Sequence, residues 1–86
     1  MDRYNLQISI AVMNTPAEYI AFLQQASNYQ LLIIQFQDIG RNNGGNHRVT
    51  LQGTADDLTR WFNEVYNPGA TYTFSILCRN HLVVRA

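Results

Sequence analysis

The amino-acid sequence predicts an α+β fold in which one antiparallel sheet is covered on one face by two helices. The prediction rests on the order of hydrophobic periodicities along the chain: strand-like, helix-like, strand-like twice, helix-like and strand-like. Alternating apolar and polar residues indicate a half-buried strand, whereas apolar residues recurring every three or four positions indicate an amphipathic helix. This is the order of a split β-α-β unit used twice, whose two crossovers should be right-handed.

The N-terminal segment predicts a strand followed by a helix. Residues 5–12 alternate between aliphatic and polar or small side chains, with the aliphatic ones facing the core. Thr15 fits the N-cap of the helix, Pro16 its first position and Glu18 the third position of a capping box. We expect this helix to end at Asn28.

The middle of the chain predicts a β-hairpin. Two segments with strand-like patterns, 31–39 and 47–53, flank a loop of Gly, Asn and Arg over residues 40–46. In the second strand of the hairpin, Val49 and Leu51 should face the core. In the first strand, the expected inward residues are Leu32, Ile34 and Phe36.

The C-terminal part predicts a second helix and more strand. Thr54 fits an N-cap, and the apolar residues that follow recur at helical spacing up to residue 66. Residues 71–78 alternate again and predict a fourth strand, with Cys78 inward, followed by a tight turn over residues 79–81. A short fifth strand over residues 82–84 should pair with the fourth.

Together these elements describe a ferredoxin-like βαββαβ sandwich. The chain has 86 residues, and we expect residues 1–86 to form a single domain of this kind. The face of the sheet opposite the two helices should be open.

The composition argues against several classes of function. Only 14% of the residues are charged, Lys is absent, and the formal net charge is zero, which disfavours bulk electrostatic binding to nucleic acid or to an anionic membrane. The single cysteine excludes an intrachain disulfide and suits a reducing compartment. The N-terminus has no apolar signal core and no run is long enough to span a bilayer, so we expect a cytoplasmic protein.

The open face of the sheet is the first candidate binding surface, either for a second copy of the chain in a homodimer or for another protein. Its side chains are almost entirely uncharged, and the cores of protein interfaces are depleted in charge. A solvated face in a protein that is poor in charge everywhere is the competing interpretation. The expected contact residues are Gln7, Ser9, Ile33, Gln35, Gln37, Thr50, Gln52, Ser75 and Leu77.

Two further surfaces are candidates for binding. The Gly- and Asn-rich loop could bind an anion through its backbone amides, although an ordinary flexible hairpin loop explains it as well. Its candidate contacts are Arg41, Asn42, Asn43, His47 and Arg48. The last strand could pair with another chain through its free edge, at Leu82, Val83 and Val84, or merely close its own sheet.

No residue pattern predicts catalysis, a metal site or a cofactor. His47, His81, Cys78 and Asp38 lack ligand spacing, and both histidines should be solvated. Cys78 and His81 could pair as nucleophile and base, but an inward Cys is more often inert.

The strand positions that bind RNA in RNA-recognition motifs also lack the residues needed. Those motifs carry stacking aromatic residues on the exposed faces of the first and third strands. The corresponding positions here hold Gln7, Ser9, Arg48, Thr50 and Gln52.

Residues 6–66 resemble the ACT regulatory domain in their order of strand, turn, Pro-initiated helix, hairpin and helix. Members of that family bind amino acids at a turn with an acidic residue and a Pro-Gly pair. In this chain the turn keeps Pro16, but Ala17 replaces the Gly and Asn14 replaces the acid. The resemblance implies a ligand-sensing homodimer with its ligand near residues 14–17, and it assigns no ligand-binding residues.

The function we expect from the sequence is that of a small non-enzymatic protein-binding module. A compact domain with an uncharged face fits an inhibitor, antitoxin or immunity protein, including phage-encoded inhibitors, which docks on a protein target. The alternatives are the ACT-like homodimer that senses a small ligand, and an enzyme with a site near Cys78 and His81.

Overall fold

The structure is a computed structural model that describes residues 1–11, 15–38 and 47–86. Within these residues it is a small α+β fold with a four-stranded sheet, three α-helices and one π-helical turn. The elements are β1 (Tyr4–Ile10), α1 (Pro16–Asn28), β2 (Leu32–Asp38), β3 (His47–Gly53), α2 (Ala55–Trp61), η2 (Phe62–Tyr66), α3 (Phe74–Asn80) and β4 (Leu82–Arg85).

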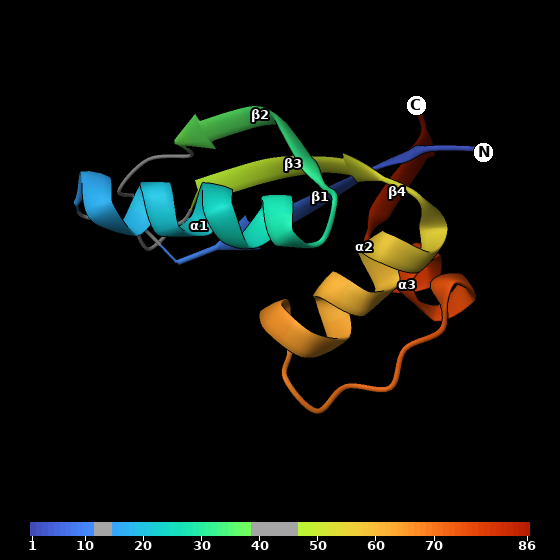
Figure 1. Cartoon of the computed structure of the whole chain (residues 1–86). Coiled ribbons are helices and arrows are strands. Elements are labelled where there is room, and N and C mark those ends of the chain that lie inside the picture. Colours follow the sequence, from blue (N-terminus) through green and yellow to red (C-terminus); the bar gives the residue numbers. More distant parts are fainter. Residues whose placement is uncertain (12–14, 39–46) are drawn as a thin grey trace.

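The sheet is antiparallel throughout, in the order β2-β3-β1-β4. The predicted pairing of the two hairpin strands is confirmed, because β2 and β3 are antiparallel neighbours. The helices lie together on one side of the sheet, so that its other side is open (Figure 1).

The core lies between the sheet and the helices. Each strand contributes its inward side chains, and all three α-helices contribute at least one buried residue. The inward faces predicted for the first strand, as far as Ile10, and for the second strand of the hairpin are confirmed, whereas residue 12 lies outside the described residues. The buried apolar residues are Leu6, Ile8, Ala26, Leu31, Val49, Leu51, Leu58, Trp61, Phe62 and Leu77.

The predicted helix starts are also confirmed. The backbone N–H of Glu18 donates to Thr15 Oγ1 at 3.2 Å, and the N–H of Asp57 donates to Thr54 Oγ1 at the same distance. Each bond satisfies one backbone donor that the first helical turn leaves free. The second predicted helix continues to residue 66, but its last turn is the π-helical η2.

The prediction of a strand over residues 71–78 is wrong. Thr73 caps the helix α3 instead, accepting a hydrogen bond from the N–H of Ile76 at 3.3 Å. An apolar run this short fits both the two-residue period of a strand and the 3.6-residue period of a helix, because Phe74 and Leu77 are also about one helical turn apart. Leu77 is consequently buried in the core, and Ser75 is exposed on α3, so neither belongs to the sheet face.

The last strand is the fourth of the sheet rather than a fifth. β4 is antiparallel to β1 at one edge of the sheet, and it does not pair with residues 71–78 as predicted. Its side chains alternate, and Val83 packs against the core while Leu82 and Val84 are exposed.

The predicted faces of β2 are also wrong in part, because the strand carries a bulge. Ile33 pairs with Leu51, and the next paired residue is Gln35, which leaves Ile34 as the extra residue. Ile33 therefore packs against the core rather than joining the open face, whereas Leu32 and Ile34, which were expected to be inward, are exposed.

Three other residues differ from expectation. His47 is buried, with its ring 4.7 Å from the ring of Phe36, and His81 is half-buried, with its ring 5.0 Å from that of Phe62. Neither histidine is therefore the solvated side chain that was predicted. Cys78 was expected to be inward, but it is exposed, because the segment that carries it is a helix rather than a strand.

Candidate functional site

Two cross-strand rows form the centre of the open face of the sheet. Strand pairing places the residues of each row side by side across the four strands in the order β4, β1, β3, β2. The first row is Leu82, Gln7, Thr50 and Gln35, and the second is Val84, Asn5, Gln52 and Leu32. We call these eight residues, together with the bulged Ile34, the amide face.

The polar side chains in the middle of the amide face bind one another. Gln52 Nε2 donates to Asn5 Oδ1 at 3.0 Å, across β3 and β1. Thr50 Oγ1 donates to Gln35 Oε1 at 3.3 Å, across β3 and β2. These bonds restrict the rotamers of the long side chains on this face.

Aliphatic side chains lie at both edges of the amide face. Leu32 and Ile34 on β2 are 57% and 47% exposed, and Leu82 and Val84 on β4 are 57% and 50% exposed. We call these two pairs the β2 ridge and the β4 ridge. A hollow of about 240 Å³ lies between the ridges, and its lining includes Gln7 and Thr50.

No residue of the amide face is charged. Arg48 is exposed at one end, in the row that it forms with Ser9 and Gln37. Near the other end, an Arg3 guanidinium nitrogen donates to the backbone carbonyl of Gln52 at 3.4 Å. The neutral area is thus bounded by arginines at its two ends.

The structure brings together only part of the predicted sheet site. Gln7, Gln35, Thr50 and Gln52 lie in the centre of the face, where Thr50 is buried among its neighbours instead of exposed as predicted, and Ser9, Gln37 and Arg48 form the end row. The two aliphatic residues of the β2 ridge could not be predicted from the sequence, because nothing in the hydrophobic pattern marks the bulge.

The other two predicted surfaces have different outcomes. The loop residues Arg41, Asn42 and Asn43 lie outside the described residues, and His47 is buried in the sheet instead of free for a contact. The strand that carries Leu82, Val83 and Val84 does form an edge of the sheet. Its pairing with another chain stays a prediction.

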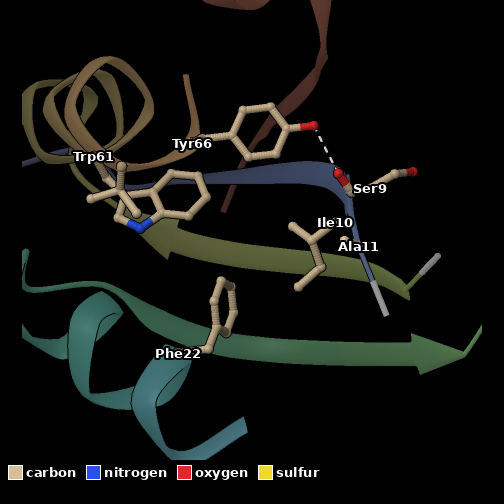
Figure 2. Close-up of a pocket in the computed structure, with 7 residues that line it drawn as sticks. Ser9, Ile10, Ala11, Phe22, Trp61 and Tyr66 are labelled. Carbon is tan, nitrogen blue, oxygen red and sulfur yellow. Dashed lines mark hydrogen bonds between the residues drawn. The ribbon is translucent and has the colours of Figure 1, made fainter. Parts of the chain in front are cut away.

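The helical side of the molecule carries a second feature, a groove lined by aromatic residues. Its volume is about 420 Å³, and it lies over the end of β1, between α1 and η2. Figure 2 shows the rings of Phe22, Trp61 and Tyr66 around it. The complete lining, which we call the aromatic groove, is Ser9, Ile10, Ala11, Phe22, Trp61, Val65 and Tyr66.

Hydrogen bonding and ring contacts hold the walls of the aromatic groove. Tyr66 donates its hydroxyl proton to the backbone carbonyl of Ser9 at 2.7 Å (Figure 2). Burial raises the pKa of Tyr66, so the hydroxyl keeps this proton at neutral pH. The Phe22 ring is nearly perpendicular to the Trp61 ring, at 82°, with 6.3 Å between centroids.

The residues that the structure describes contain no group of three or more His, Cys, Asp or Glu side chains placed to hold a metal ion. None of the helices within these residues has both the length and the apolar character needed to cross a membrane.

Comparisons with protein-family models, with curated proteins and with solved structures find no match for this chain. The amide face and the aromatic groove are therefore the basis for any statement about function.

Proposed function

We propose that this chain is a non-enzymatic protein-binding module that docks on a protein target through the amide face. The observation that carries the proposal is the pairing of a neutral, hydrogen-bonded polar centre with exposed aliphatic ridges on both sides. Interface cores combine apolar area with a low density of charge. Covering a half-exposed aliphatic side chain would contribute about 1 kcal/mol, half of the roughly 1.5–3 kcal/mol for full burial.

The shape of the amide face favours a convex partner. The hollow between the two ridges needs atoms to fill it, because interfaces pack as densely as protein interiors. A second copy of the chain, packed face to face in register, would oppose one hollow to another and leave both unfilled. A helix or loop of another protein that enters the hollow would fill it and contact both ridges, at Ile34 and Leu82, together.

The proposal also includes a type of fold, a type of biological role and a cellular compartment. The sheet order, with helices on one side, supports a ferredoxin-like sandwich. An inhibitor, antitoxin or immunity protein, phage-encoded ones included, acts by occupying a surface of its target, and a preformed docking face suits that role. We place the interaction in a reducing compartment such as the cytoplasm, in keeping with the single cysteine, Cys78.

The test is a capture experiment with matched variants. Leu32→Glu and Leu82→Glu each put a charge on one ridge at a position that is more than half exposed, so the fold should tolerate them. Ile20→Glu is the control, because Ile20 on α1 is 52% exposed and lies outside the amide face.

The tagged wild-type chain and the three variants are exposed to lysate of the source cells, and bound proteins are compared. We expect a protein that the wild type and Ile20→Glu retain and that both face variants lose. The proposal is wrong if every captured protein binds the face variants as well as it binds the control.

The ACT-like homodimer remains a second proposal. The aromatic groove opens beside Ala11, close in sequence to the turn where the resemblance puts a ligand. Residue 14 of that turn lies outside the described residues. Stabilisation by an amino acid in a thermal-shift assay would support this function, since a ligand at 100 times its dissociation constant stabilises by about 2.7 kcal/mol.

A further inference from the structure

The aromatic groove has the dimensions of a small-molecule site. Its volume of about 420 Å³ falls within the roughly 300–1,000 Å³ of typical ligand pockets. Its walls come from β1, α1, α2 and η2, so four elements converge on one space. The groove is on the helical side of the sheet, away from the amide face.

The walls of the groove suit an aromatic ring. The rings of Phe22 and Trp61 are nearly perpendicular, and those of Trp61 and Tyr66 are inclined by 31° with centroids 5.7 Å apart. Aromatic pairs prefer edge-to-face or offset arrangements, and a ring placed in the groove would meet the half-buried rings of Phe22 and Tyr66, since Trp61 is only 1% exposed. Aliphatic contacts come from Ile10 and Val65.

The π-helical turn helps to form this wall. The N–H of Asn67 donates to the carbonyl of Phe62 at 2.8 Å, five residues back, which widens the last turn of the helix. Val65 and Tyr66, which line the groove, belong to this turn. Single π-helical turns are frequent at functional sites.

Charge limits the ligand that the groove can hold. None of its lining residues is charged, so an ion placed there would lose hydration without a charged partner. The groove should therefore bind a neutral molecule better than a zwitterionic amino acid, and an amino acid bound in it would favour the ACT-like proposal instead.

Two lining residues each have hydrogen-bonding capacity that the described residues do not use. The Tyr66 hydroxyl uses its proton on Ser9 and keeps its oxygen lone pairs as acceptors. Trp61 is 1% exposed, and its Nε1–H has no acceptor among the described residues. In Figure 2 this nitrogen lies on the side of the indole nearer Phe22.

We propose that the aromatic groove binds an uncharged small molecule that carries an aromatic ring and one hydroxyl or carbonyl group. This site goes beyond the protein-binding function and does not depend on it. The two sites lie on opposite sides of the sheet, so loss of one leaves the other testable.

The experiment uses three probes of similar size: benzyl alcohol, benzoate and benzylammonium. Trp61 is the only tryptophan, so its fluorescence reports directly on the groove. We expect benzyl alcohol to change the emission saturably, with a dissociation constant at least tenfold lower than those of the two ions. Equal responses to the three probes, or no saturation with benzyl alcohol, would overturn the proposal.

A pair of variants checks the location of the binding. Ala11→Phe adds a ring at an exposed position in the groove, whereas Ala21→Phe adds the same ring at an exposed position on α1 that does not line it. Ala11→Phe should weaken binding of benzyl alcohol at least tenfold, and Ala21→Phe should leave it unchanged. Thermal unfolding establishes that both variants are folded, and unchanged binding by folded Ala11→Phe would contradict the assigned site.

Discussion

The side chain of Asn63 binds both backbone polar groups of Tyr72. Asn63 Nδ2 donates to the Tyr72 carbonyl, and the Tyr72 N–H donates to Asn63 Oδ1, each at 3.0 Å. A neighbouring strand would satisfy the same two groups in a sheet. Asn63 therefore replaces the pairing that a strand over residues 71–78 would have needed, and it fixes the chain just before α3.

We predict that Asn63→Ala destabilises the fold by about 2 kcal/mol, because a partly buried backbone donor and acceptor both lose a partner. Urea unfolding measures the change. Asn80→Ala is the control, since it removes one exposed hydrogen bond, from Asn80 Nδ2 to the Ile76 carbonyl, and should cost much less. Equal losses for the two variants would show that the two-point contact has no special role.

A second prediction concerns Gly53, the last residue of β3. A Cβ atom at this position would collide with the side chain of Leu31, which is buried in the core. Gly53→Ala should therefore destabilise the protein by about 1–3 kcal/mol, the usual cost of overpacking.

Trimming Leu31 tests the cause of that loss. In the double variant Gly53→Ala/Leu31→Val, the shorter side chain gives the new methyl group room. The cost should be less than the sum of the two single substitutions, as double-mutant cycles show for residues in contact. If the destabilisation of the double variant equals the sum of the two single destabilisations, the collision with Leu31 is not the cause of the loss.

The third prediction concerns alkaline pH. Tyr29 donates its hydroxyl proton to Glu64 Oε1 at 2.8 Å, and this hydrogen bond is the first cause that raises the pKa of Tyr29 above its ordinary value of 10.0. A raised folded-state pKa means that the stabilisation is complete below the unfolded-state pKa. It is lost as the pH rises through the folded-state value.

Spectrophotometric titration of the tyrosines measures this effect. Tyr29→Phe should remove the contribution of Tyr29 to the titration, and Glu64→Gln should lower the pKa of Tyr29 by removing the carboxylate. The loss of stability at alkaline pH should be smaller in Tyr29→Phe than in the wild type. A Tyr29 pKa that Glu64→Gln leaves unchanged would exclude Glu64 as the cause.

Local interactions explain which features of the fold can be predicted from the sequence. Thr15 and Thr54 are recognisable as caps because their side chains act within four residues of chain. The bulge is not recognisable, because Ile33 and Ile34 have the same side chain and either can face the core. The polar centre of the amide face can therefore be predicted from the alternation of apolar and polar residues, whereas the β2 ridge cannot, because it depends on the bulge.

The helix α3 shows a second reason why a sequence-based prediction fails: distant contacts decide between a strand and a helix. The run from Thr71 to Cys78 alternates well enough to predict a strand, and its cap and spacing also fit a helix. Two distant features favour the helix, the contact from Asn63 and the position of β4 on the free edge of β1. Neither is visible in the local pattern, which is why the sequence predicts the wrong surface for residues such as Leu77.

The last prediction follows from docking on an external target and separates that proposal from the ACT-like homodimer: the protein should be a monomer in solution. Face-to-face dimerisation would leave the hollow of each amide face unfilled, and the lost van der Waals contacts would weaken the dimer. Light scattering over a concentration series should therefore give a mass near 9.9 kDa at every concentration. A dimer that Leu32→Glu and Leu82→Glu dissociate, while Ile20→Glu does not, would assign the amide face to self-association and contradict its proposed use for an external target.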